Sequence, residues 1–357
     1  MHLAALGWDE LFAAAFAALA PGPDVEPARV VIGFNYLYRV WTDHGELDAT
    51  LSGRLKHRAT SRSELPAVGD WVAVRRRSHQ DKGAIVAVLS RRSAFSRRMA
   101  GAVTDEQVVA ANVDIIFVVM GLDADFSIRR LERYLLLAHE GGAAPVIVLT
   151  KPDLSDDAGG HVAEVTPVAG AVSVHVVNPR SGAGVDAIGA YLTPGRTGAL
   201  LGSSGVGKST IINRLVGADV RKTREVRASD QKGRHTTSHR ELVVLPNGGL
   251  IIDTPGMREL QLWDVGESVR ETFDEIETLA AACRFTDCRH RNEPRCAVKA
   301  AVADGSLRSD RLESYLKLQD ELVALARQQD ERALLEQKRQ AKIVGKALKK
   351  HYREERS

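Results

Sequence analysis

Cysteine is scarce in this chain, which has three in 357 residues, all between Cys283 and Cys296. Three thiols cannot build the disulfide framework of a small secreted domain, and their tight clustering favours a metal site. No run of 18 apolar residues occurs, so no transmembrane helix is expected. The first 22 residues lack a basic segment, and Asp9 and Glu10 interrupt their apolar run, which argues against a signal peptide. The expected compartment is therefore the cytoplasm.

Aromatic residues are also few, at 5%, but apolar residues make up 44% of the chain and charged residues 27%. This composition excludes a globally disordered protein, and the length predicts two or three domains. The net charge of +3 conceals a division along the chain. Residues 28–100 carry a net charge of +8, residues 331–357 one of +5, and residues 101–330 one of −6. Two basic segments flanking an acidic body indicate a polyanionic partner.

The N-terminal part of the sequence predicts a helical extension followed by a small barrel. Residues 1–27 fit an amphipathic helix with apolar positions at Leu3, Leu6, Leu11, Phe12, Phe16 and Leu19. Residues 28–100 predict an OB-fold-like, RNA-binding barrel, because they contain short β-rich segments at 28–34, 36–42, 45–55, 70–77 and 83–90. The RNA-binding prediction depends on basic residues interleaved with aromatic ones, a pattern that ordinary solvated surfaces also show. These residues are Lys56, Arg58, Arg75, Arg76, Arg77, Arg91, Arg92, Arg97 and Arg98, with Tyr38, Trp41 and Trp71.

Residues 101–265 alternate apolar strands with helices, which predicts an α/β domain with a mostly parallel sheet. The strands are expected within 114–122, 144–153, 171–177, 197–202, 240–246 and 249–256, and the helices within 127–142, 184–192 and 209–217. Residues 266–307 then predict a small domain around the cysteine cluster. Residues 308–357 predict a basic helical tail.

The strongest local motif is GSSGVGKS, which fits the phosphate-binding loop pattern G-x-x-x-x-G-K-[ST] and stands between an expected strand and an expected helix. In such a loop the backbone N–H groups surround the phosphates at a helix N-terminus. Lys208 then reaches the β- and γ-phosphates, and the Ser209 hydroxyl binds Mg²⁺. The predicted residues are Gly202, Ser203, Ser204, Gly205, Val206, Gly207, Lys208, Ser209 and Thr210.

The sequence TKPD, at residues 150–153, indicates that the base is guanine. It ends an expected buried strand, where open α/β sheets place ligand groups. Asp153 is expected to accept hydrogen bonds from N1–H and N2–H₂ of guanine, a pair of donors that adenine lacks. The stem of Lys151 is expected to lie along the base. Thr150 replaces the Asn that is commoner there, so a weaker hydrogen bond between the loops is expected.

Two further motifs complete a GTP site. DTPG, at residues 253–256, fits D-x-x-G, in which Asp253 holds Mg²⁺ through water and the Gly256 N–H contacts the γ-phosphate. KGRHTT, at residues 232–237, lies where a switch loop supplies a threonine to Mg²⁺, and either Thr236 or Thr237 could take that role. TKPD precedes the phosphate-binding loop here, whereas it follows that loop in ordinary GTPases. This order predicts a circularly permuted domain, which neighbouring chain termini make possible.

Water activation also departs from the usual pattern, since Met257 stands where many GTPases have a glutamine that orients the attacking water. His235 in the switch loop is the nearest candidate for that role, the alternative being that it only structures the loop. The predicted catalytic residues are thus His235, Lys208 and Thr237. Slow intrinsic hydrolysis, accelerated by a macromolecular partner, is expected.

The three cysteines belong to a C-x4-C-x-H-x5-C pattern. Three thiolates and one imidazole make a closed tetrahedral Zn²⁺ site, which stabilises a segment too small for its own core. The alternative is three free thiols near an unrelated histidine. The predicted zinc ligands are Cys283, Cys288, His290 and Cys296.

With GRHTT, DTPG, the Cys-His spacing and AANVD at residues 110–114, the chain resembles the ribosome small subunit-dependent GTPase A family over about residues 28–305. The resemblance implies an N-terminal OB-like β-barrel, a central circularly permuted α/β P-loop GTPase domain and a C-terminal α-helical zinc-binding domain. It also implies a bacterial assembly factor that binds the small ribosomal subunit and its rRNA, and hydrolyses GTP there late in maturation. A monomer is expected. Other readings are a permuted GTPase of the large subunit, a P-loop ATPase or kinase, and a nucleic-acid-binding regulator that uses GTP only for folding.

One segment departs from the family pattern. A Ser-Ala-Lys sequence usually follows the strand after TKPD, and the N–H of its alanine contacts O6 of guanine. This chain has Asn178, Pro179 and Arg180 there, and Pro179 has no N–H to donate. Either a neighbouring amide replaces it or the loop shifts toward Ser181, and guanine affinity is expected to be lower.

Overall fold

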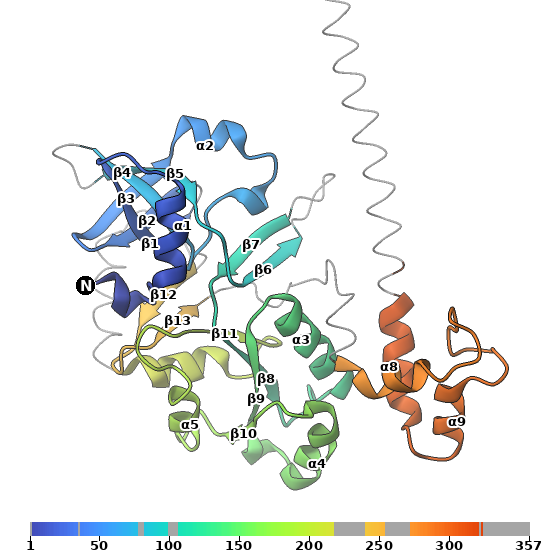
Figure 1. Cartoon of the computed structure of the whole chain (residues 1–357). Coiled ribbons are helices and arrows are strands. Elements are labelled where there is room, and N and C mark those ends of the chain that lie inside the picture. The colour runs from blue at the N-terminus through green and yellow to red at the C-terminus, as the bar shows by residue number, and fades with distance from the viewer. Residues whose placement is uncertain are drawn as a thin grey trace, which may run out of the picture. The chain divides into compact units, whose positions relative to one another are not determined.

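The computed structural model describes residues 2–34, 36–77, 82–98, 106–217, 240–253, 272–320 and 323 (Figure 1). The chain forms two compact units, residues 1–261 and residues 262–357. In the described part, no helix is both long and apolar enough to cross a membrane.

The predicted five-strand barrel is confirmed. Its strands pair in the order β1-β2-β3-β5-β4, and β4 pairs back onto β1 to close it. Inward side chains from every strand, such as Val30, Val40, Leu47, Val74 and Ile85, fill the interior and are almost fully buried. The strands are β1 (Val25–Phe34), β2 (Leu37–Thr42), β3 (Gly45–Leu51), β4 (Trp71–Arg76) and β5 (Lys82–Val88).

The third strand of the barrel is shorter than the sequence predicted. The strand expected through residue 55 ends at Leu51, because Ser52 caps helix α2 (Gly53–Arg58) by accepting a hydrogen bond from the Leu55 N–H. A 3₁₀ turn, η2 (Arg62–Glu64), follows α2.

The single N-terminal helix is instead two pieces, η1 (Leu3–Leu6) and α1 (Glu10–Ala18). Gly7 breaks it with a φ of 86°, and a Cβ there would lie 2.5 Å from the Gly195 carbonyl oxygen, so only glycine fits. Leu11 and Leu19, expected on the apolar face, are 56% and 44% exposed.

A separate two-stranded sheet links the barrel to the α/β part. Strand β6 (Ala94–Arg98) pairs antiparallel with β7 (Glu106–Ala111). This pairing crosses residue 100, where the boundary between the barrel and the GTPase domain is expected.

The predicted α/β alternation is confirmed. The sheet order is β10-β9-β8-β11-β13-β12, with every pair parallel except β12–β13. The strands are β8 (Ile115–Gly121), β9 (Ala144–Thr150), β10 (Val174–Val177), β11 (Thr197–Leu201), β12 (Arg240–Val244) and β13 (Leu250–Asp253). The helices are α3 (Ile128–Glu140), η3 (Pro152–Leu154), α4 (Ala158–Ala169), α5 (Val185–Gly189) and residues 208–217.

One strand pair makes the barrel and the α/β sheet continuous. Strand β12 pairs antiparallel with β1, with Ile32 opposite Glu241 and Gly33 opposite Arg240. Because β12 also pairs with β13, the barrel connects through a single strand to the strand that ends at Asp253.

The second unit is helical. It contains α8 (Asp274–Ala280), α9 (Ala297–Ala303) and a helix over residues 309–320. Its small core gathers Phe273, Ile276, Val298, Leu312 and Tyr315.

Candidate nucleotide-binding site and metal centre

The sheet brings the predicted nucleotide motifs to one edge (Figure 1). The phosphate-binding loop follows β11, TKPD closes β9, Asp253 closes β13, and Asn178 follows β10. All four strands run parallel, so their carboxyl ends meet at the same side of the sheet. This is the edge at which open α/β sheets bind ligands.

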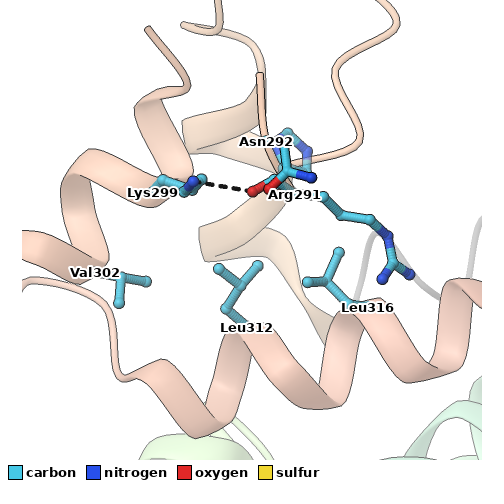
Figure 2. Close-up of a pocket in the computed structure, with 7 residues that line it drawn as sticks. Arg291, Asn292, Lys299, Val302, Leu312 and Leu316 are labelled. Carbon is cyan, nitrogen blue, oxygen red and sulfur yellow. Dashed lines mark hydrogen bonds between the residues drawn. The ribbon is translucent and has the colours of Figure 1, made fainter. Parts of the chain in front are cut away.

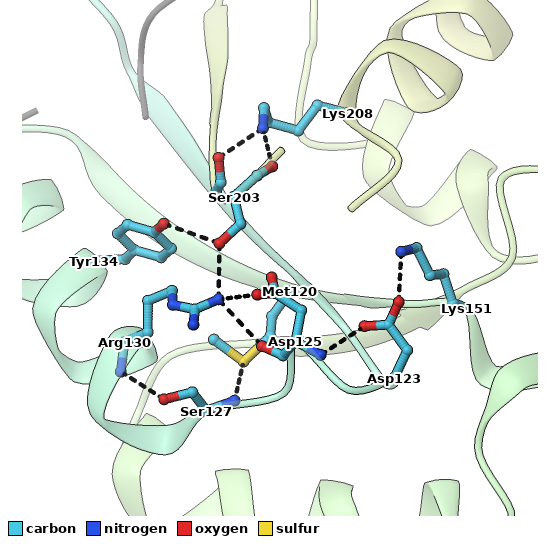
Figure 3. Close-up of polar contacts among 10 residues, drawn as sticks. Met120, Asp123, Asp125, Ser127, Arg130, Tyr134, Lys151, Ser203 and Lys208 are labelled. Atoms are coloured by element: carbon cyan, nitrogen blue, oxygen red, sulfur yellow. Dashed lines mark hydrogen bonds and ion pairs between the residues drawn. The ribbon is translucent and has the colours of Figure 1, made fainter. Parts of the chain in front are cut away.

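The phosphate-binding loop has the backbone geometry that the motif predicts. Gly205 and Gly207 have φ values of 76° and 100°, a region that favours glycine. At Gly202 the φ is 156°, and a Cβ would lie 2.2 Å from the Val119 carbonyl oxygen. Figure 3 shows the Lys208 ammonium turned onto its own loop, 2.6 Å from the Gly202 carbonyl oxygen and 2.5 Å from that of Ser203. An incoming phosphate would therefore compete with two backbone carbonyls for this ammonium.

Thr150 joins the predicted base-binding loop to the phosphate-binding loop. Its Oγ1 lies 2.6 Å from the Val206 carbonyl oxygen and 3.2 Å from that of Met120, and Thr150 is fully buried. The hydroxyl thus supplies the contact between the loops for which an asparagine is commoner. The single hydroxyl hydrogen favours the shorter of the two contacts.

Lys151 is held by a residue that the sequence analysis did not single out. Its ammonium lies 2.6 Å from Asp123 Oδ2 (Figure 3), and this hydrogen bond holds the pKa of Asp123 below its usual value. Lys151 itself has a φ of 58°, a left-handed conformation that is rare for lysine and is seen where surroundings enforce it. Asp123 comes two residues after the end of buried β8, so its place after a parallel strand is the signal that could have identified it.

Helix α3 braces the phosphate-binding loop, which the sequence analysis also missed. Arg130 Nη1 donates to Ser203 Oγ over 2.9 Å and also contacts Asp125, while Tyr134 Oη lies 3.4 Å from the same hydroxyl (Figure 3). Arg130 and Tyr134 are four residues apart, so both lie on the face of α3 toward the loop. These contacts hold the first turn of the phosphate loop against the neighbouring helix.

Asp153 faces the loop that follows β10. Asn178 Nδ2 donates to Asp153 Oδ1 over 2.9 Å, so the two base-binding segments are in direct contact. From the helix that follows the phosphate-binding loop, Arg214 Nε donates to the Pro179 carbonyl oxygen over 3.1 Å. The predicted guanine-binding carboxylate is thereby oriented by a side chain next to Pro179.

Of the remaining predicted nucleotide residues, some lie in the described part of the chain and some do not. Asp253 lies at the end of β13 beside β11, while Ser209 and Thr210 open the helix of residues 208–217. The switch and γ-phosphate residues fall outside the described residues, namely His235, Thr236, Thr237 and Gly256.

The predicted RNA surface of the barrel is only partly available. Trp71 and Tyr38 are core residues, 1% and 7% exposed, so neither presents a face for base stacking. Several arginines are already engaged: Arg91 makes a bidentate pair with Asp70 at 2.8 and 2.7 Å, and Arg75 and Arg76 pair with Asp24 and Glu26. The exposed basic residues of α2 are Arg54, Lys56 and Arg58.

The four predicted zinc ligands come together in the second unit. Their ligand atoms all lie within 4.8 Å of one another. Cys283 Sγ is 3.6 Å from His290 Nδ1 and 3.8 Å from Cys296 Sγ, and His290 Nδ1 is 3.3 Å from Cys296 Sγ. A tetrahedral Zn²⁺ with ordinary bond lengths requires S···S and S···N edges of about 3.8 and 3.5 Å. The donor set and its spacing therefore fit one zinc ion.

The electrostatics of the cluster favour a metal over free thiols. The pKa of Cys288 is raised to about 11, mainly by burial and also by the neighbouring sulfurs of Cys296 and Cys283, although the backbone N–H of His290 acts to lower it. Burial also raises the pKa of Cys283, but the N–H groups of Val298 and Ala297 at the start of α9 bring it below its usual value. Burial lowers the pKa of His290, which favours the neutral imidazole that binds metals. A cation would supply the charge that three close thiolates need.

A cavity of about 460 Å³ lies beside this cluster (Figure 2). Val302, Leu312 and Leu316 form its apolar part, and basic side chains stand at its edge. Lys299 Nζ donates to the Arg291 carbonyl oxygen over 2.9 Å, and Arg291 pairs with Asp320 at 2.6 Å. The side chains of Lys299 and Arg291 at this cavity are therefore already engaged by groups within the second unit.

Comparisons with known proteins agree with this geometry. Residues 88–263 match the family model described as RsgA GTPase. Residues 197–333 match a second model, described as 50S ribosome-binding GTPase. The first match contains both TKPD and the phosphate-binding loop, so it covers the permuted order of motifs.

Curated relatives align over almost the entire chain. The small ribosomal subunit biogenesis GTPase RsgA of Opitutus terrae is 50% identical over 339 residues, which cover 92% of each chain. The protein of the same name from Syntrophotalea carbinolica is 43% identical over 363 residues, covering 99% of each chain.

Solved structures share the fold. YjeQ from Thermotoga maritima superimposes with a TM-score of 0.63 at 26% identity, covering 84% of this chain and 99% of that one. YloQ, described as a circularly permuted GTPase, gives a TM-score of 0.59 at 23% identity, covering 84% of this chain and 96% of that one. Taken with the motif geometry and the curated relatives, these matches show that the chain belongs to the RsgA GTPase family and is a circularly permuted GTP hydrolase.

Proposed function

We propose that this GTPase binds the small ribosomal subunit, hydrolyses GTP there during late maturation, and then departs. The observation that supports this most is the near-complete alignment with relatives named for biogenesis of the small ribosomal subunit. The large-subunit alternative has one point in its favour, the description of the second family model. That model covers only residues 197–333 and excludes the barrel, whereas the relatives align with both barrel and GTPase domain.

The proposed nucleotide site uses the residues at the carboxyl edge of the sheet. Asp153 recognises the guanine base, and residues 202–210, which include Lys208, hold the phosphates. Ser209 and Asp253 hold Mg²⁺ together with Thr236 or Thr237. Mg²⁺ would neutralise charge that develops on the phosphates. His235 is proposed to orient the attacking water, because Met257 cannot. One Zn²⁺ held by the four ligands of the second unit would be structural, since all its positions are filled by protein.

The fold suggests how binding of RNA to the barrel would affect the nucleotide site. The barrel is proposed to contact rRNA through the exposed basic side chains of α2. Strand β1 of that barrel pairs with β12, which directly follows the segment that contains the predicted switch threonines. A displacement of the barrel on RNA would thus act on one end of that segment. The proposal includes a cytoplasmic location, where ribosomes are assembled, and a monomeric state.

The test is steady-state GTP turnover with purified small subunits, large subunits or neither, over a salt series. We expect stimulation by small subunits alone, decreasing as salt rises, because phosphate contacts release counterions. Lys208→Ala should abolish turnover in every mixture. Stimulation by large subunits alone, or none, contradicts the proposal. Displacement of labelled GTP by equimolar ATP would favour the ATPase or kinase alternative.

A further inference from the structure

The loop over residues 178–183 uses all of its own backbone donors. Asn178 N donates to Ala183 O at 2.9 Å, and Gly182 N donates to Asn178 O at 2.8 Å. The N–H groups of Arg180 and Ser181 both donate to Asn178 Oδ1, at 3.1 and 3.3 Å, and Ala183 N donates to Ser181 Oγ at 3.3 Å. Position 179 is proline and has no N–H. No backbone N–H of this loop is therefore left for a ligand.

These hydrogen bonds bear on the two ways in which the missing N–H of Pro179 was expected to be replaced. A neighbouring amide cannot replace the missing N–H without giving up its bond to Asn178 Oδ1. The loop is also anchored, since Arg214 Nε donates to the Pro179 carbonyl oxygen and the same guanidinium contacts the Arg180 carbonyl oxygen. A shift of the loop toward Ser181 would break these contacts.

The side chain of Asn178 has one donor to spare. Its Oδ1 accepts two backbone N–H groups and its Nδ2 faces the carboxylate of Asp153. The reverse orientation would set oxygen against a carboxylate and NH₂ against two donors, so the chemistry assigns the amide. Of the two hydrogens on Nδ2, one goes to Asp153, and the other has no partner among the described residues.

We propose that Asn178 is a specificity-determining residue, whose amide donates one N–H to Asp153 and the other to O6 of guanine. This rests on the proposed role of Asp153. A carboxylate that accepts from N1–H and N2–H₂ has one oxygen beside N1, and O6 is bonded to the carbon next to N1. The proposal places Oδ1 beside N1, so that a donor that touches Oδ1, as Asn178 Nδ2 does, is close to O6. The side chain thus replaces the backbone N–H that Pro179 lacks.

The experiment pairs changes in the protein with a change of one atom in the base. Binding of GDP, 6-thio-GDP, IDP and ADP to the full chain is measured by titration calorimetry. Asn178→Ser keeps one hydroxyl donor for Asp153 but removes the amide hydrogen that is proposed to donate to O6. It should weaken GDP and IDP binding by about tenfold. Its effect on 6-thio-GDP, whose sulfur is a poor acceptor, should be less than about threefold.

A second substitution provides the rescue. Asn178→Ser combined with Pro179→Ala restores a backbone N–H at position 179, so GDP affinity should return to within about threefold of the unmodified protein. Arg180→Ala is the matched control, because Arg180 is an exposed cation in the same loop. An equal loss for GDP and 6-thio-GDP, no loss, or a loss in Arg180→Ala instead would overturn the inference.

The design separates two kinds of failure. If the unmodified chain does not prefer GDP to ADP, or if Asp153→Ala leaves GDP binding intact, the guanine site itself is wrong. If GDP is preferred and Asp153→Ala removes that preference, but Asn178→Ser acts equally on all analogues, only the assignment of Asn178 is wrong. The comparison of GDP with 6-thio-GDP on the unmodified chain needs no variant and so does not depend on folding of the variants.

Discussion

Arg29 Nη2 lies 2.8 Å from Thr197 Oγ1, and this contact joins barrel strand β1 to β11, the strand that ends in the phosphate-binding loop. The same buried guanidinium donates to the carbonyl oxygens of Leu6, Gly69 and Asn112. Burial lowers the pKa of Arg29 to about 10, so it stays protonated at neutral pH. One cation thereby ties the N-terminal turn, the barrel and the α/β sheet together.

Arg29→Ala should destabilise the protein by at least about 3 kcal/mol, because it leaves buried carbonyl groups without donors. Urea unfolding of the full chain measures this loss. Arg39→Ala is the control, since Arg39 pairs with Asp48 at 3.1 Å near the surface and should cost less than about 1 kcal/mol. Equal costs for the two variants would show that the Arg29 contacts are not what joins these elements.

Thr150→Val should weaken GDP binding by about tenfold, because valine keeps the shape of the side chain but removes the donor to Val206 O. Thr150→Ser keeps the hydroxyl and should change the affinity by less than about threefold. Titration calorimetry with GDP measures both. If valine binds GDP as well as threonine does, the contact between the loops contributes nothing to nucleotide affinity.

The Asp123–Lys151 pair predicts a pH dependence. The hydrogen bond from Lys151 lowers the pKa of Asp123 in the folded chain, so its contribution to stability is present above the unfolded pKa of about 4. That contribution is lost as the pH falls through the lower folded pKa. Asp123→Asn should therefore be less stable than the unmodified protein at pH 7 and equally stable at low pH. The unfolding midpoints of Asp123→Asn and of the unmodified protein are measured from pH 7 to pH 3. A difference between the two midpoints that stays constant over this range would contradict the prediction.

Zinc removal should unfold the second unit selectively. Elemental analysis should find one zinc per chain, and Cys296→Ser should lose it, because three ligands hold the ion far less well than four. Circular dichroism should then show a loss of helix while GDP binding stays within about threefold, since the nucleotide residues lie in the first unit. Asp287→Ala, an exposed change within the same loop, is the control. Full helix content in the zinc-free variant would refute the structural role of the ion.

The basic side chains of α2 should contribute to ribosome affinity. Changing Arg54, Lys56 and Arg58 together to alanine should flatten the salt dependence of small-subunit binding by about one to three in the logarithmic slope. Arg75→Ala with Arg76→Ala is the comparison, because both of these arginines already pair with acids. Sedimentation binding at several salt concentrations gives the slopes. A larger effect from the second set would move the predicted RNA surface to β4.

Local sequence patterns were sufficient to predict the features that depend on residues close together in the sequence. The five barrel strands, the buried parallel strands and the glycines of the phosphate-binding loop follow from apolar periodicity and backbone freedom. The N-terminal helix is present but divided into η1 and α1, because Gly7 packs against Gly195, a contact that spacing within residues 1–27 cannot reveal. The aromatic residues of the barrel were assigned to a binding surface although Trp71 belongs to the core.

The sequence by itself determined the permuted order of the motifs, the phosphate-binding loop and the four-residue metal pattern, because each is a short segment with a fixed chemistry. Only the tertiary structure decided which partners these residues have. Lys151 pairs with Asp123, Ser203 with Arg130, and Asp153 with Asn178, across separations of 25 to 73 residues. Such contacts arise when parallel strands bring their ends to one edge, and the sheet order that does so is set by packing of the entire domain.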